Sequence, residues 1–218
     1  MADRESQAPD KEARSAEAEI TLGLLNAVHE NSALTQRSAA RDLGIALGLA
    51  NAYLKRCVKK GLIKVSQVPA NRYAYYLTPK GFTEKSRLTA EYLSSSFGFF
   101  RAARRQCTEA FAECARHGWR RIALAGTGDL GEIATLCALE APVTLAGFVD
   151  GGAGAGGKFA GLPVAARLSD LGPVDAVLVT DLRRPQETFE QMAAALPFER
   201  VLVPRLLNVT RAAKKIGG

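Results

Sequence analysis

Apolar and polar residues alternate with helical periodicity over the first sixty residues of the chain. From Ile20 to Val28 the apolar residues fall at i, i+4, i+5 and i+8, which predicts one face of an amphipathic helix. Thr35 is a suitable N-cap for a short second helix that ends at Gly44, and a third helix is predicted over 47–60, before Gly61. Three helices with a tight turn between the last two have helix-turn-helix spacing.

Two β-rich runs follow this predicted third helix. The runs LIKVSQV and YAYYL are separated by residues 69–72, which predicts a hairpin whose tip carries Arg72. Such a hairpin would be the wing of a winged helix. Thr78 and Pro79 then predict the start of another helix, because proline is tolerated in the first helical turn.

An apolar seam continues along this last helix, which is expected to run on to about Arg116. Its positions are separated by alternating steps of four and three residues, as in a coiled coil, and one of them, Arg104, breaks the apolar seam: Leu93, Phe97, Phe100, Arg104, Cys107, Phe111 and Cys114. The seam needs a partner, either the C-terminal half of the chain or the same helix of a second subunit. We expect a homodimer, which is the usual arrangement for proteins that recognise two DNA half-sites.

The C-terminal half alternates short apolar strands with helices. Strands are expected over 121–125, 143–149, 162–165, 176–180 and 200–203, with helices over 132–139 and 185–196. This alternation predicts a mostly parallel sheet. The expected fold class is α/β, with an N-terminal winged helix-turn-helix, a long linking and dimerisation helix, and a C-terminal Rossmann-like parallel sheet domain. The corresponding boundaries are a flexible charged N-terminus (1–18), the winged helix (19–79), the long helix (80–118) and the Rossmann-like domain (119–218).

The first strand of the C-terminal half leads directly into a glycine-rich turn and a helix. The turn is Gly126-Thr127-Gly128-Asp129-Leu130-Gly131, a G-x-G-x-x-G pattern in the strand–turn–helix context that phosphate binding requires. Asp150 ends the next strand, where its carboxylate can accept hydrogen bonds from ribose hydroxyls. These residues predict a nucleotide-binding site; the alternative is a Rossmann-like unit that has lost its ligand.

Two basic residues, Lys158 and Arg183, are expected in loops at the same edge of the sheet, where they could hold phosphate. Lys158 belongs to GGAGAGGKFAGLPV, which we expect to be a mobile loop because of its glycine content. No catalytic residues are assigned. The C-terminal half contains no Tyr-x-x-x-Lys pair, no G-x-S-x-G turn and no histidine.

Charge is distributed unevenly along the chain. Residues 32–105 carry fourteen Lys or Arg against three acids, a net +11, whereas residues 119–218 carry a net +1. This asymmetry predicts that the N-terminal half meets a polyanion, and double-stranded DNA is the expected partner. The candidate DNA contacts are Gln36, Arg37, Gly48, Asn51, Lys55, Lys59 and Arg72.

These contacts have different expected roles. The Asn51 amide can pair with adenine in the major groove, Lys55 and Lys59 can neutralise phosphates, and Arg72 can reach the adjacent backbone or the minor groove. The alternative is a three-helix protein-interaction domain with a solvated basic face.

Composition excludes several other classes of protein. The 218 residues are 47% hydrophobic and 23% charged, which is typical of a folded globular protein. No apolar run is long enough to span a membrane, and the first twenty residues do not resemble a signal peptide, so we expect a cytoplasmic protein. The four cysteines contain no C-x-x-C pair, so no metal site is expected, and three of them lie in apolar patterns typical of buried thiols.

The stretches QRSAARDLGIALGLANAYLKRCVKKGLIKV and YAYYLTPKGFTEKSRLTAEYL closely resemble MarR-type regulators associated with exopolysaccharide gene clusters. The resemblance covers residues 20–105 and implies DNA binding and transcriptional control. Gly48 and Asn51 match the recognition-helix pattern of that family. Leu49 departs from it, since a polar or basic residue is expected there.

The order GTGDLGE, LAGFVD, KFAGLPV and DAVLVT resembles the Rossmann-like domain of Rex-type redox repressors, which bind NAD(H). It is equally similar to the N-terminal domain of sugar acyltransferases and to nucleotide-sugar enzymes that modify polysaccharides, although residues 128–130 replace the acyltransferases' usual Gly-Gly-His. The two resemblances together imply a regulator that senses a nucleotide sugar or NAD(H) and controls polysaccharide genes. The alternatives are a regulator whose α/β half only mediates dimerisation or protein docking, and a small nucleotide-sugar-modifying enzyme.

Overall fold

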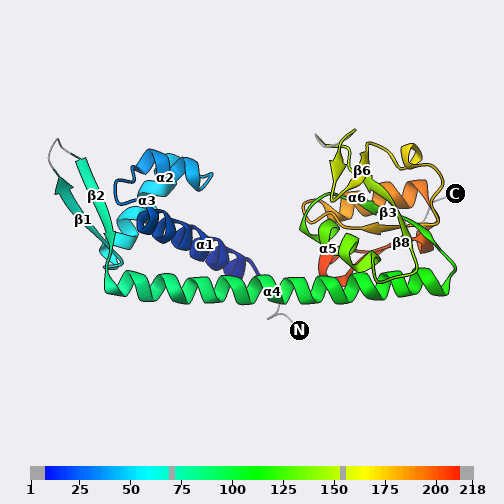
Figure 1. Cartoon of the computed structure of the whole chain (residues 1–218), viewed down its shortest axis with the longest axis horizontal. Coiled ribbons are helices and arrows are strands. Elements are labelled where there is room, and N and C mark those ends of the chain that lie inside the picture. Colours follow the sequence, from blue (N-terminus) through cyan, green and yellow to red (C-terminus); the bar gives the residue numbers. More distant parts are fainter. Residues whose placement is uncertain (1–7, 69–71, 153–155, 212–218) are drawn as a thin grey trace. The chain divides into compact units, whose positions relative to one another are not determined.

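The computed structural model describes residues 8–68, 72–152 and 156–211, and its contacts divide the chain into two units, Met1–Ser96 and Phe97–Gly218. The first unit consists of three helices, a hairpin and the start of a long helix (Figure 1). Their bounds are α1 Ala8–Glu30, α2 Gln36–Asp42, α3 Leu47–Lys59, β1 Ile63–Val68, β2 Arg72–Leu77 and α4 Pro79–Arg116.

Local interactions predicted from the sequence set the ends of these helices. Thr35 and Ser38 form a capping box at the start of α2, in which each hydroxyl accepts the other residue's backbone N–H at 3.0 Å. Gly44 and Gly61 take left-handed φ angles of 63° and 70° just after α2 and α3, a conformation that suits glycine. Thr78 Oγ1 accepts a backbone hydrogen bond of 3.0 Å in the first turn of α4.

Helix α1 is longer than expected. The sequence predicted a helix over 20–28 after a flexible segment at 1–18, whereas α1 already begins at Ala8. Its predicted apolar face is buried in the core of the first unit. Part of the added length is explained by Glu17, whose carboxylate pairs with Arg56 of α3 at 2.5 Å.

Strands β1 and β2 form the predicted antiparallel hairpin. Arg72 was expected at the hairpin tip, but it is the first residue of β2 and pairs with Val68. The tip itself, residues 69–71, lies outside the described residues. The Tyr75 backbone N–H donates to Ser32 O at 2.9 Å, so the hairpin is attached to the segment between α1 and α2.

The second unit contains a six-stranded sheet in the order β5-β6-β4-β3-β7-β8. Its strands are β3 Arg121–Ala125, β4 Thr144–Val149, β5 Lys158–Phe159, β6 Leu162–Ala165, β7 Ala176–Val179 and β8 Val201–Leu202. All neighbouring pairs are parallel except β5 and β6. Helices α5 (Asp129–Ala138) and α6 (Pro185–Ala195) and the short 3-10 turns η1 (Leu168–Leu171), η2 (Phe198–Arg200) and η3 (Arg205–Leu207) complete the unit. The α/β fold class is confirmed.

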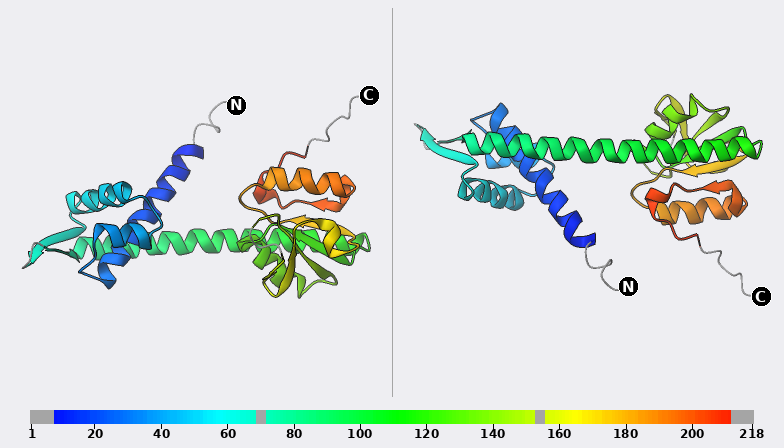
Figure 2. Two further views of the ribbon diagram at one scale, coloured as in Figure 1. Left: turned by 90° about the horizontal axis from the view of Figure 1, so that it is seen from above. Right: turned by 90° about the horizontal axis from the view of Figure 1, so that it is seen from below.

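The direction of the strand order reverses at β3. From β3 the chain passes through α5 to β4 and then to β6 on one side, before β7 and β8 are added on the other side. Right-handed crossovers place α5 and α6 on opposite faces, and α6 lies along β7 and β8 (Figure 2). The carboxyl ends of β3 and β7 therefore form a topological switch point, where open α/β sheets bind ligands.

The apolar seam predicted along α4 divides into two parts. One part packs into the core of the second unit, through Ala103, Cys107, Phe111 and Cys114. The other part is exposed and contains Leu93, Phe97 and Phe100. Arg104 interrupts the apolar seam, as expected: its side chain is exposed and pairs with Glu140 at 3.0 Å, while the buried stripe passes through Ala103.

The glycine-rich segment 151–164 contains a short hairpin, so the expectation of a loop was wrong for part of it. Lys158 pairs with Pro163 across β5 and β6, around a turn in which Ala160 and Gly161 have positive φ angles. Residues 153–155 lie outside the described residues. Lys158 consequently lies on a strand at the edge of the sheet.

All four cysteines are buried and free. Burial raises the pKa of the Cys107 and Cys114 thiols to about 12, so both stay protonated near neutral pH. Within the described residues no three His, Cys, Asp or Glu side chains converge as metal ligands. None of the helices in that part of the chain is long and apolar enough to cross a membrane.

Candidate functional site

The outward face of α3 is the first candidate site. One face of α3 is buried in the first unit, through Ala50, Leu54 and Cys57. Gly48, Ala52, Lys55 and Lys59 form the opposite, exposed face, and the exposed leucines Leu47 and Leu49 flank it on either side. Among the described residues Arg37, Lys55 and Lys59 form no ion pair, so their charges are available to a polyanion.

Asn51 does not have the orientation that a bidentate contact with adenine requires. Its Oδ1 atom is buried and has no hydrogen-bond partner among the described residues. The residue lines a cavity of about 290 Å³ that also contacts Gln36, Lys55 and Lys59. An amide whose oxygen is buried cannot offer both its donor and its acceptor to a base edge. The predicted adenine contact therefore requires the Asn51 side chain to rotate outward.

A larger cavity of about 910 Å³ lies between the start of α2, the start of α3 and strand β2. Gln36, Arg37, Leu47 and Tyr73 are among the residues that line it. The structure thus brings Gln36 and Arg37 next to the N-terminal turn of α3. The side chain of Arg72 lies outside the described part of the hairpin.

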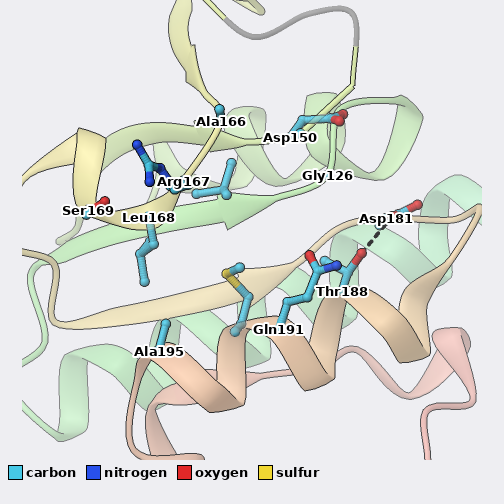
Figure 3. A pocket seen from close by; sticks show the side chains of 13 residues that line it. Gly126, Asp150, Ala166, Arg167, Leu168, Ser169, Asp181, Thr188, Gln191 and Ala195 are labelled. Atoms are coloured by element: carbon cyan, nitrogen blue, oxygen red, sulfur yellow. Dashed lines mark hydrogen bonds between the residues drawn. The ribbon is translucent and has the colours of Figure 1, made fainter.

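The second candidate site is a cavity of about 390 Å³ beyond the carboxyl ends of the strands in the second unit (Figure 3). Strands β3, β4, β6 and β7 each contribute a lining residue within two positions of their carboxyl end, and α6 adds polar side chains. These residues include Gly126, Asp150, Arg167, Asp181, Thr188 and Gln191. The cavity has the position at which parallel α/β sheets bind ligands.

The three glycines of the G-x-G-x-x-G turn are required for different reasons. A Cβ atom on Gly126 would lie 2.5 Å from the Asp181 Cβ, and one on Gly131 would lie 2.7 Å from Phe148 Cε1, so both glycines are needed for packing. Gly128 has a φ angle of 136°, yet a Cβ there would meet nothing within 4 Å. Gly128 therefore keeps open space in front of α5, as close approach of a phosphate requires.

Asp150 is hydrogen-bonded to the glycine-rich turn. Thr127 Oγ1 donates to Asp150 Oδ2 at 2.5 Å, and the Thr127 N–H donates to the same oxygen at 3.2 Å. Gly152 N donates to Oδ1 at 3.0 Å. The Thr127 hydroxyl, with these backbone donors, lowers the pKa of Asp150. The carboxylate is therefore ionised near neutral pH and retains lone pairs that can accept a ligand hydroxyl.

The other predicted ligand contacts differ in location. Asp129 is exposed at the first position of α5, whereas Leu130 is fully buried and belongs to the core. Arg183 lies after β7, and its charge contributes to the lowered pKa of Asp150. Of the predicted ligand contacts only Gly126 and Asp150 line the cavity; the rest of the glycine-rich turn, Lys158 and Arg183 lie outside its lining.

Arg167, Ser169 and Gln191 were not predicted as site residues. The position of Arg167, two residues after the predicted strand over 162–165, was a signal that could have identified it, because carboxyl ends of parallel strands meet at one edge. Gln191 lies within α6, where the sequence gives no indication of a ligand.

We expect Asp150→Asn to remove a pH-dependent contribution to stability. Because the pKa of folded Asp150 is lowered, its carboxylate stabilises the fold above the unfolded-state pKa of about 3.9 and loses this effect as pH falls through the folded value. The variant should be less stable at pH 7 by about 1 kcal/mol, given partial solvent screening. Thermal unfolding from pH 7 to pH 3 should show the difference shrinking at the acid end. A constant difference would contradict this role of the charge.

Residues 17–64 match the family model for winged helix-turn-helix DNA-binding domains. The N-terminal unit is a winged helix-turn-helix domain. The match ends in β1 and covers less than a quarter of the chain.

Two solved structures are similar to parts of the chain. One is MepR, a transcription regulator of the Staphylococcus aureus multidrug efflux pump MepA, with 25% identity over 38% of this chain and 61% of that chain and a TM-score of 0.33. The other is PigF with SAH, with 13% identity over 91% of this chain and 58% of that chain and a TM-score of 0.24. The chain thus spans about three fifths of the length of each. Comparison with curated proteins gives no match.

Proposed function

We propose that the protein is a transcriptional regulator that binds duplex DNA through its winged helix and responds to a nucleotide-type effector in the α/β unit. The observation that carries the proposal is the match of residues 17–64 to winged helix-turn-helix DNA-binding domains. The net charge of +11 over residues 32–105 supports it, because a basic surface attracts DNA. Control of polysaccharide genes is supported only by the resemblance of residues 20–105 to MarR-type regulators.

We expect DNA affinity to fall steeply as salt concentration rises. Each lysine–phosphate contact contributes about −0.9 to the slope of log K against log salt, so Lys55→Ala should weaken binding to all sequences alike and reduce the slope by about 1. Lys158→Ala, in the other unit, is the matched control and should leave the slope unchanged. The measurement is fluorescence anisotropy on the promoter regions that flank the gene. Absence of binding at low salt would contradict the proposed function.

A homodimer is the functional form that we propose. Exposed apolar residues in the second unit support this: Phe97 and Phe100 of α4 are 57% and 38% exposed, Leu136 of α5 is 56% exposed, and Leu139 at the C-cap of α5 is 82% exposed. The end of α5 lies against α4, because Glu140 pairs with Arg104. We call these four residues the α4–α5 patch. A second copy of the chain would cover the patch and supply a second winged helix for a second half-site.

The proposed effector is a nucleotide sugar or NAD(H), with its phosphates over 126–131 and a ribose at Asp150. The open space at Gly128 and the ionised carboxylate of Asp150 support this class of ligand. Arg167 lines the same cavity and adds a positive charge that can approach a phosphate.

The exposed α4–α5 patch also favours a second candidate function, in which the α/β unit only mediates dimerisation or protein docking. Calorimetry against NAD⁺, NADH and UDP-, GDP- and CMP-sugars distinguishes the two. Binding of any of these ligands supports a nucleotide-sensing regulator. If the folded protein binds none of them, the result supports an α/β unit that only mediates dimerisation or docking. Turnover of a bound nucleotide sugar would instead support the third candidate, a small modifying enzyme.

A further inference from the structure

The N-terminal turn of α3 is apolar where it is most exposed. Leu47 and Leu49 are 47% and 42% exposed, although a leucine is usually buried. Successive residues of an α-helix are rotated by 100°, so the two leucines lie on either side of Gly48. Ala52 lies one turn beyond Gly48 on the same outward face. A Cβ atom on Gly48 would meet nothing within 4 Å, so another molecule can approach the backbone of this turn closely.

The polar side chains near this turn are directed elsewhere. Asn51 has its amide oxygen buried. Arg56 pairs with Glu17 at 2.5 Å, and its guanidinium carbon lies 5.1 Å from the centre of the Tyr53 ring. In the described part of α3, the charged groups available to DNA begin at Lys55, on the turns that follow. The first turn can therefore make apolar contacts with bases but lacks side-chain hydrogen bonds to them in this conformation.

The charge around the leucines indicates which molecule covers them. Arg37 at the start of α2 lines the same cavity as Leu47, and Gln36 belongs both to this cavity and to the one lined by Lys55 and Lys59 of α3. Leucines surrounded by cations fit the major groove of DNA better than the apolar surface of a protein, because the phosphates neutralise the cations while the groove receives the helix.

We propose that Leu47 and Leu49 recognise the C5-methyl groups of thymines in the major groove. The inference rests on the proposed DNA binding and deepens it by assigning a readout chemistry. The thymine methyl is the apolar group that the major groove presents, and apolar side chains contact it. Each half-site should accordingly contain thymines at positions where a methyl group, and not a hydrogen bond, determines affinity.

Replacement of thymine by uracil tests this proposal directly, because it removes the methyl group and keeps every hydrogen-bonding group of the base pair. The duplex is selected from a random library with the full-length protein, and each thymine is then replaced singly. Anisotropy at constant salt should show at least one position per half-site where uracil lowers affinity about threefold to tenfold, as expected for one buried methyl group.

Variants assign each methyl contact to a leucine. Leu47→Ala and Leu49→Ala should each remove the thymine–uracil difference at one position and retain it elsewhere. Leu182→Ala removes a leucine of similar exposure, 43%, from the other unit and outside the α4–α5 patch, and should retain every difference. Melting temperatures measured alongside should be unchanged, since all three side chains are exposed.

Two failures have different meanings. Equal affinity for thymine and uracil at every position, with binding that still depends on salt, would overturn methyl recognition and leave the regulator function in place. Absence of binding to any duplex at low salt would overturn the proposed function and this inference with it.

Discussion

Replacement of both Phe97 and Phe100 by glutamate is expected to convert the protein from a dimer to a monomer. Both rings are exposed on α4, and the proposed dimer buries them. An unpaired charge in such an interface costs several kcal/mol, so two of them should raise the dimer dissociation constant by a factor on the order of 1,000 or more. Light scattering at tens of micromolar protein measures the change in mass.

Ser95→Glu is the matched control for this experiment. Ser95 is exposed on the same helix, about half a turn around from Phe97, so its replacement adds a charge without entering the patch. This variant should remain a dimer, and circular dichroism should show the same helix content in all three proteins. A monomeric wild-type protein, or a dimeric double variant, would mean that α4 is not the interface.

Gly128→Val is expected to abolish the response to a nucleotide ligand and to leave basal DNA binding intact. Valine would fill the open space in front of α5, and a β-branched residue does not fit a φ angle of 136°. Loss of two charged hydrogen bonds to phosphate, each worth about 1.5–3 kcal/mol, would lower ligand affinity about 100-fold or more. Calorimetry with NAD⁺, NADH and nucleotide sugars measures ligand affinity, and anisotropy with and without ligand measures the response.

The matched control separates loss of the site from backbone strain. Gly118 also has a positive φ angle, 72°, and a Cβ atom added there would meet nothing within 4 Å; it follows α4 and lies outside the glycine-rich turn. Gly118→Val should therefore also strain the backbone and still bind ligand. If it loses ligand binding as well, strain explains the effect of Gly128→Val. A ligand changes DNA affinity only through different affinities for two states of the protein, and typical coupling of about 1–3 kcal/mol corresponds to a change of roughly 5- to 150-fold.

Local interactions made most of the elements predictable. Thr35, Gly44 and Gly61 act on residues within a few positions of themselves, so the ends of α2 and α3 could be derived from the sequence. The positions of the glycine-rich turn and of Asp150 in the fold could also be derived from the sequence. Both directly follow parallel strands, and the carboxyl ends of neighbouring parallel strands lie at one edge of the sheet.

Tertiary structure decided which distant residues meet. The spacing of the α4 seam fits a core and a dimer interface equally well, and only the packing of the sheet shows that Cys107 and Phe111 are buried while Phe97 and Phe100 are exposed. Arg167 reaches the cavity because β6 is added outside β4, an order that periodicity does not encode. The burial of the Asn51 oxygen likewise depends on how α2, α3 and the hairpin pack together. Helix ends and turns follow from interactions between chain neighbours, whereas these three outcomes depend on contacts between segments far apart in the sequence.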